Sequence, residues 1–144
     1  MGIRLPRAGR LRRMENRMMS NGNERDAIET VVVEYLEGMI YGQGERLKRA
    51  MHPQCMQAGH FDGTYEFFDR ETFISSVEGE TALPPGTPYE YEIVSLDITG
   101  DVAVAKVTDA CFGTTFTDYL TLIKHDGQWQ IVMKAFFDHA NAAS

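Results

Sequence analysis

The first part of the chain carries apolar residues at helical spacing. Between Asn23 and Gly42 they lie one, three or four positions apart along a single stripe: Ile28, Val31, Val32, Tyr35, Leu36 and Met39. Asn23 can cap the first turn of this helix, and Gly42 can end it. A second, shorter helix is predicted over residues 45–51, before Pro53.

The pattern then changes from helical to alternating. Gly59 and Gly63 interrupt residues 54–68, which we predict to form two short strands. Asp69 can cap a third helix over residues 70–77. A proline-rich loop follows, and from there apolar and polar residues alternate in four segments that predict four strands: 89–98, 102–112, 114–124 and 128–138.

Helices followed by four long strands predict an α+β fold. The sheet needs one apolar face covered, and each helix has one apolar stripe to cover it. A strongly curved, mostly antiparallel sheet wrapped around the long first helix would leave a cavity at its open end. An all-β barrel with added helices is the alternative, but the first helix is too regular for it.

Charge is distributed unevenly over the 144 residues. The net charge is −7, yet residues 1–23 hold six arginines against Glu15 alone, so this arm carries +5 and the rest −12. An acidic body repels phosphates, so we expect no nucleic-acid partner for the domain. We predict a disordered basic arm over 1–23, a domain over 24–138 and a short tail over 139–144.

Location is inferred from what the sequence lacks. The arm has no apolar core of a secretory signal, and no stretch is long enough to span a bilayer, so no membrane partner is expected. Cys55 and Cys111 are too few for a disulfide framework. A cytoplasmic protein with reduced thiols is the resulting prediction.

Two charges interrupt the apolar pattern of the last two strands. Asp118 shares a strand face with Phe116, Leu120 and Leu122, and Lys134 breaks the apolar run of the returning strand. A buried charge without a partner is costly, so each needs a counter-charge, water or a ligand. Asp118 is therefore the best candidate for a pocket acid or base, although a purely structural ion pair fits the same pattern.

The turn at Asp126-Gly127 decides whether these charges meet. A two-residue loop pairs His125 with Gln128 and leaves the charges on opposite faces. A three-residue loop with Gly127 as a bulge residue sets Asp118 directly opposite Lys134. We favour the bulge, because it gives both charges a partner.

Histidines supply a second set of candidates. His52 can cap the end of the second helix, and His60 precedes the turn residues Asp62-Gly63; either can contact a ligand at the mouth of a cavity. With Cys55 they lack the second compact ligand pair of a metal site, so no metal is expected. The sequence has no glycine-rich phosphate loop and no nucleophile elbow, so we expect no cofactor.

Three stretches resemble the putative lumazine-binding family of the nuclear transport factor two-like superfamily. They read YLEGMIYGQGERLKRAMHP, ITGDVAVAKV and FTDYLTLIKHDGQWQIVMKAFF, and the resemblance covers about residues 24–138. It implies a cone-shaped, cystatin-like fold with a pocket, and a homodimer. Relatives include ketosteroid isomerases, dehydratases and polyketide cyclases beside members without catalysis. Superfamily enzymes often use a tyrosine at the position of Tyr35 as a hydrogen-bond donor into the pocket.

The leading interpretation is a protein that binds a small apolar or ring-containing molecule. Its polar candidates are Tyr35, His52, His60, Asp118 and Lys134. If it is catalytic, isomerisation, dehydration or cyclisation through an enolate fits best, because one carboxylate and one hydroxyl donor in a dry pocket suffice. The alternative is a non-catalytic dimeric interaction module whose pocket is filled by its own side chains.

Overall fold

The computed structural model describes residues 7–79 and 82–140. Its helices are α1 (Arg7–Ile40), α2 (Gly44–Ala50) and α3 (Arg70–Gly79). Its strands are β1 (Met51–Phe61), β2 (Thr64–Asp69), β3 (Tyr91–Thr99), β4 (Val102–Cys111), β5 (Thr114–His125) and β6 (Gln128–Asp138). Every predicted helix and strand is present, most with ends within three residues of the prediction.

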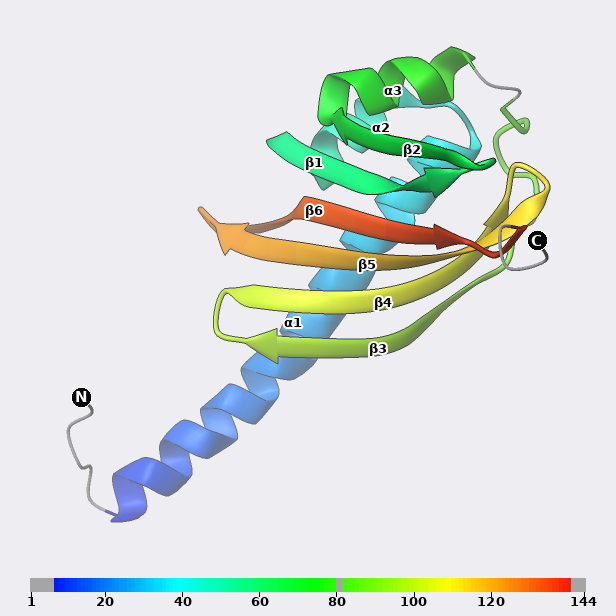
Figure 1. Ribbon diagram of the computed structural model, residues 1–144. Coiled ribbons are helices and arrows are strands. Elements are labelled where there is room, and N and C mark those ends of the chain that lie inside the picture. The colour runs from blue at the N-terminus through cyan, green and yellow to red at the C-terminus, as the bar shows by residue number, and fades with distance from the viewer. Residues whose placement is uncertain (1–6, 80–81, 141–144) are drawn as a thin grey trace.

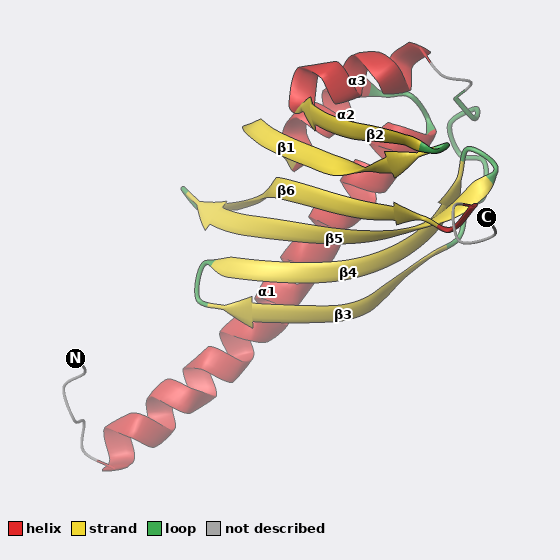
Figure 2. Cartoon of the chain, in the orientation of Figure 1, coloured by secondary structure: helices red, strands yellow, loops and turns green. Residues whose placement is uncertain are grey.

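The six strands form one curved sheet with the order β2-β1-β6-β5-β4-β3. Every neighbouring pair is antiparallel except β1 with β6. Helix α1 crosses one face of the sheet, and α2 and α3 lie near the β1–β2 edge (Figures 1 and 2). The α+β prediction, with a curved and mostly antiparallel sheet on a long N-terminal helix, is confirmed.

The predicted start of the first helix is wrong. We expected it to begin at Asn23, after a disordered arm, but α1 begins at Arg7 and includes 34 residues. Arginine, methionine, leucine and glutamate favour helix, and no proline occurs between Arg7 and Ile40. Asn23 therefore lies within the helix instead of capping it. Residues 1–6 of the predicted arm lie outside the described residues.

The core fills the space between α1 and the sheet face toward it, which we call the inner face. Alternate residues of β4, from Ala103 to Cys111, are buried, and those between them are more exposed. Ile28, Val32 and Leu36 of α1 are fully buried, as are the residues of β5 and β6 that face them: Leu120, Leu122 and Ile131. Burying each of these aliphatic side chains contributes about 1.5–3 kcal/mol.

The turn between β5 and β6 differs from the favoured prediction. Asp126 and Gly127 have φ angles of 51° and 77°, and His125 pairs with Gln128, so this is a two-residue loop without a bulge. The positive φ at both positions matches the twist of the flanking strands. A bulge does occur, but further along: Thr121 pairs with Met133 and Leu122 with Ile131, which leaves Val132 as the extra residue.

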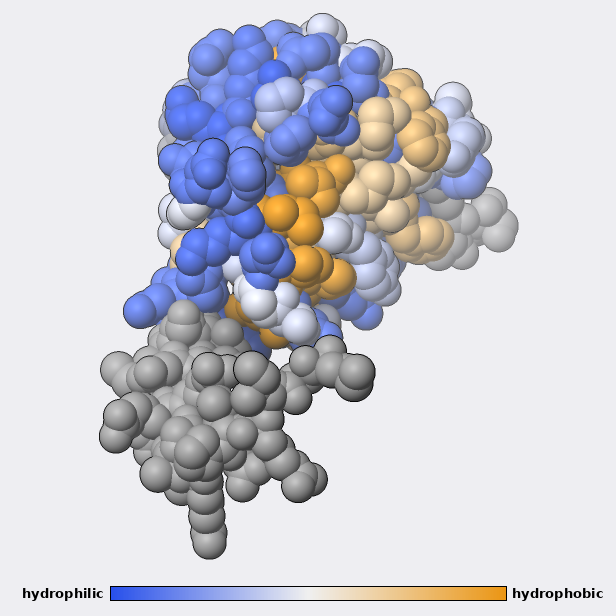
Figure 3. Space-filling model, turned by 90° about the vertical axis from the view of Figure 1, so that its left-hand side faces the viewer, coloured by the Kyte–Doolittle hydropathy of each residue, from blue (hydrophilic) through white to orange (hydrophobic). Residues whose placement is uncertain are grey.

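The opposite, outer face of the sheet carries exposed apolar side chains. Tyr119 and Phe137 are 48% and 45% exposed, and β2 adds Tyr65 and Phe67. Figure 3 shows a band of hydrophobic residues flanked by hydrophilic ones on one side of the molecule. Trp129 of β6 is buried.

Candidate functional site

The bulge at Val132 brings the two unusual charges to the same face. Between the turn and the bulge, Trp129 and Ile131 point inward; beyond it, the inward residues are Lys134 and Phe136. Asp118 pairs with Phe136, and Leu120 pairs with Lys134. Asp118 and Lys134 are therefore diagonal neighbours on the inner face. We had expected the two residues to lie directly opposite each other, and this expectation is wrong.

Asp118 is held by the long helix. It is 1% exposed, and its Oδ2 accepts a 2.9 Å hydrogen bond from the hydroxyl of Tyr35, which is completely buried on α1. Burial raises the pKa of Asp118, whereas Lys134 and the Tyr35 hydrogen bond act in the opposite direction. Burial and the nearby carboxylates raise the pKa of Tyr35, so its hydroxyl keeps its proton.

A second buried carboxyl group, Asp109, was missed in the sequence. It lies on the inner face of β4, pairs with Phe116 of β5 and is 2% exposed. Burial, and then the charge of Asp118, raise the pKa of Asp109 to about 7. Because the charge of Asp118 is among the causes that raise the pKa of Asp109, Asp109 is the group of the pair that keeps its proton to the higher pH.

Strand alternation could have identified Asp109. It has the same parity as Ala103, Ala105 and Val107, all of which are buried. Beside it, Cys111 Sγ lies 3.5 Å from Oδ2 of Asp109. Burial raises the pKa of the Cys111 thiol, so this sulfur stays protonated and donates. The floor of the site thus holds two hydrogen-bonded pairs, Cys111 with Asp109 and Tyr35 with Asp118.

Lys134 lies among aromatic rings. Its Nζ is 4.5 Å from the ring centre of Phe73 and 5.1 Å from those of Tyr35 and Phe136. Three ring faces stabilise an ammonium group that is 5% exposed. Its charge lowers the pKa of both Asp118 and Asp109, so the three ionisable groups act on one another across the inner face.

A small cavity opens over these residues. Its volume is about 90 Å³, and its wall is mostly aromatic: Phe61, Phe73, Phe112, Phe116 and Phe136. Its polar lining residues are Gln57, Glu66, Ser76, Asp118 and Lys134. Gly59 makes room for one of the rings, because a Cβ there would lie 2.6 Å from the backbone oxygen of Phe136 and 2.7 Å from its ring.

One cavity residue has an unusual backbone conformation. Phe112, in the turn between β4 and β5, has a φ of 52°, which bulky residues rarely adopt. Its ring packs edge-on against that of Phe61 and lines the cavity. Phe112 thus forms part of the tight turn and part of the cavity wall. Its backbone conformation costs about 1–3 kcal/mol.

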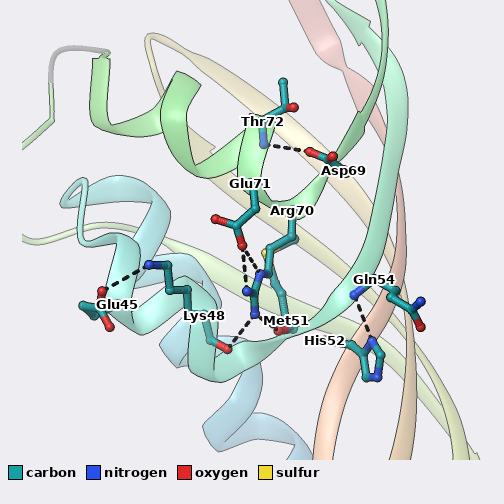
Figure 4. A network of polar contacts seen from close by, with 9 residues as sticks. All are labelled: Glu45, Lys48, Met51, His52, Gln54, Asp69, Arg70, Glu71 and Thr72. Atoms are coloured by element: carbon teal, nitrogen blue, oxygen red, sulfur yellow. Dashed lines mark hydrogen bonds and ion pairs between the residues drawn. The ribbon is translucent and has the colours of Figure 1, made fainter.

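The two candidate histidines lie elsewhere. His52 belongs to β1 instead of ending α2, and its Nδ1 accepts a 3.0 Å hydrogen bond from the N–H of Gln54 (Figure 4). His60 pairs with Tyr65 on the outer face, with the ring centres 5.2 Å apart. Neither lines the cavity. Gln57 and Phe61 of the same strand face the cavity, and His60 lies an odd number of residues from each of them. Strand alternation therefore places His60 on the opposite, outer face.

Figure 4 also confirms the cap of the third helix. The N–H of Thr72 donates a 2.8 Å hydrogen bond to Oδ1 of Asp69. Arg70 reaches back from α3 to the carbonyl oxygens of Lys48 and Met51, which fixes α3 against the end of α2. This contact places Phe73, and therefore one wall of the cavity, over Lys134.

Within 7–79 and 82–140, no three histidine, cysteine, aspartate or glutamate side chains are grouped so that they could hold a metal ion. Over the same residues, no helix combines the length and apolar character needed to cross a membrane. Cys55 and Cys111 are both free and buried.

A curved sheet on a long helix with a cavity above its inner face defines an NTF2-like protein. An NTF2-like protein of unknown function from Silicibacter pomeroyi superposes with a TM-score of 0.77 and 28% identity, over 82% of this chain and 98% of that one. One from Methylobacillus flagellatus gives 0.69 and 27%, over 81% and 93%. The chain belongs to the family described as putative lumazine-binding, whose model matches residues 23–137.

A curated relative has an enzyme name. The aldolase FrzH from Cladobotryum sp. is 28% identical over 120 residues, which are 81% of this chain and 93% of that protein. The similarity therefore extends over nearly the whole domain that holds the cavity.

Proposed function

We propose that this protein binds a small carbonyl compound in the cavity and moves a proton to or from the carbon next to the carbonyl. The observation that carries the proposal is the buried pair of carboxyl groups at the cavity floor, in which Asp109 keeps its proton up to about pH 7 beside Asp118. Asp118 lines the cavity and would take the proton. Asp109, behind it, would set the basicity of Asp118.

Lys134 supplies the complementary group. Loss of a proton beside a carbonyl places negative charge on the carbonyl oxygen, and an ammonium fixed in a water-poor site stabilises that charge. Lys134 lines the same cavity and is held by three rings. Tyr35 already donates to Asp118, so its role would be to orient the base.

The relative named as an aldolase supports the same class of chemistry. An aldol reaction also begins with removal of a proton beside a carbonyl. Isomerisation, dehydration and cyclisation through an enolate share this first step and need no cofactor. We therefore propose the shared step, and no particular product.

The cavity volume favours one alternative function. Ligand pockets usually have volumes of about 300–1,000 Å³, whereas this cavity has about 90 Å³. A non-catalytic interaction module would need no larger space. Against it stand the two carboxyls and the lysine, whose burial is costly and brings no advantage to a filled core.

Exchange of hydrogen for deuterium tests the proposal directly. Cyclohexanone in D₂O with the protein should lose its α-proton NMR signals faster than in buffer, and Asp118→Asn should abolish the acceleration. Asp97→Asn, which changes an exposed carboxylate of β3, is the matched control and should keep the full rate. Circular dichroism establishes that each variant is folded.

Two results would contradict the proposal. The first is an Asp118→Asn variant that is folded and exchanges at the wild-type rate. The second is no acceleration by the wild-type protein with any ketone from acetone to cyclohexanone. The second result, together with no small molecule in the native mass spectrum of the purified protein, would favour the interaction module.

A further inference from the structure

Gln57 is a polar residue of the cavity that the proposed reaction does not use. It lies on β1, directly beside Lys134 of β6 in the parallel register, and both side chains line the cavity. Gln57 is 3% exposed, so it is shielded from bulk water almost completely.

Glu66 fixes the orientation of the Gln57 amide. The Nε2 of Gln57 donates a 3.3 Å hydrogen bond to Oε1 of Glu66 on the neighbouring strand β2. A carboxylate can only accept, so the amide nitrogen must face it and the amide oxygen must point elsewhere. The opposite rotamer would bring two acceptor oxygens together.

The amide oxygen of Gln57 then lacks a donor. Within the described part of the chain, no group donates a hydrogen bond to Oε1, although this atom is buried. Buried polar atoms almost always have a partner, and leaving one without a partner is costly. The missing group is therefore a donor, and the cavity is the space from which it can come.

We propose that Gln57, oriented by Glu66, selects ligands that carry a hydroxyl or N–H group in addition to their carbonyl. The inference rests on the proposed function, because it places the ligand carbonyl at Lys134. Since Gln57 and Lys134 are register partners, the donor and the carbonyl must lie a few bonds apart in the ligand. A β-hydroxy ketone has this arrangement.

A pair of compounds of equal size tests this selection. 3-Hydroxycyclohexanone and 3-methylcyclohexanone differ in one group of similar volume, and only the first can donate. Titration of the ¹⁵N-labelled protein, followed by NMR, should show that the hydroxy compound binds about tenfold more tightly or better. The side-chain amide signal of Gln57 should shift with the hydroxy compound.

Three variants separate recognition from structure. Gln57→Met should bind both compounds equally and should unfold at the same temperature as the wild type or higher, because a buried oxygen without a donor has been removed. Glu66→Gln should lower the preference without reversing it, since the Gln57 amide can then turn. Gln54→Met, an exposed change on the same strand, should keep the full preference.

Each outcome bears on the inference in one direction. Equal binding of the two compounds by the wild type overturns it, whether or not exchange is catalysed. A preference that persists in Gln57→Met also overturns it. A preference lost in Gln57→Met supports it even if neither compound exchanges its protons, a result that would contradict only the proposed proton transfer. If neither compound binds, the inference about Gln57 and the proposed function are both overturned.

Discussion

At the scale of single residues, the site depends on carboxyl groups that are less acidic than usual. Asp109 and Asp118 are both nearly inaccessible, and between them they keep one proton. The free energy of unfolding must then depend on pH. Below the ordinary pKa of aspartate, near 3.9, both the folded and the unfolded chain hold the Asp109 proton.

We predict that Asp109 makes the protein less stable as pH rises from about 4 to about 7. In this interval the unfolded chain has lost the proton and the folded one keeps it, so folding binds a proton that becomes scarcer. Asp109→Asn, which carries no charge at any of these pH values, should remove this loss, which is on the order of 4 kcal/mol. Urea unfolding of both proteins from pH 4 to 8.5 measures it.

Other groups titrate in the same range, so the difference between the two proteins is the quantity to examine. It should grow up to about pH 7 and then stay constant. A difference that does not change with pH would mean that Asp109 titrates normally. Asp97→Asn, on the exposed side of β3, should show no such trend.

Asp118 and Lys134 should depend on each other energetically. Each charge loses its nearest compensation when the other is removed, so Asp118→Asn and Lys134→Met should each lower the free energy of unfolding by about 1–4 kcal/mol. The double variant should lose less than the sum. Chemical denaturation of the four proteins measures the coupling, and additive losses would show that the two side chains act independently.

At the scale of elements, one extra residue determines what β6 presents to the cavity. Because of Val132, the inward positions change from odd to even numbers along the strand. If β6 kept all its residues but alternated regularly from Trp129 onward, Lys134 and Phe136 would point outward and their neighbours inward.

We predict that deletion of Val132 leaves a protein that folds with Lys134 still facing inward, because the deletion removes the extra residue and keeps Leu122 opposite Ile131 and Thr121 opposite Met133. Val132→Ala keeps the bulge and should cost no more than about 1.5 kcal/mol. Thermal melting followed by circular dichroism measures both variants. A deletion variant that does not melt cooperatively would show that the bulge is needed for more than the register of the two strands.

The sequence predicted the elements well and the registers less well. Alternation marks strands such as β4 clearly, whereas Ile131, Val132 and Met133 are all apolar and give no sign of which one is the extra residue. The shared face of Asp118 and Lys134 was thus predicted correctly from the need of charges for partners, but through the wrong turn. The alternation of β4 already placed Asp109 on the buried face, whereas Gln57 was missed because sequence spacing does not show that β1 lies beside β6.

At the scale of the molecule, the exposed outer face of the sheet is the main unexplained surface. We predict a homodimer through this face, because Tyr119 and Phe137 would otherwise remain in water. Tyr119→Glu should shift sedimentation toward the monomer at micromolar concentration. Leu83→Glu, which alters an exposed loop residue, should not. A wild-type protein that sediments only as a monomer would contradict the prediction.

The basic arm should be unnecessary for folding. From Gly22 onward, where the burial of α1 is described, the first buried apolar residue is Ile28. Glu24 is joined to the sheet by a 2.6 Å ion pair with Lys124 and a hydrogen bond from Trp129. A chain that begins at Gly22 keeps all of these groups and should melt within a few degrees of full length. A much lower melting temperature would show that residues 1–21 stabilise the domain.

The position of β6 has a consequence for synthesis of the chain. This strand is the last to be made, yet it lies in the middle of the sheet, between β1 and β5. Until β6 leaves the ribosome, the nascent chain has two groups of strands, β1–β2 and β3–β4–β5. No strand yet pairs with both groups. Lys134 lies on β6 itself. The sheet and the charged groups of the cavity therefore become complete in the same step, when β6 pairs with β1 and β5.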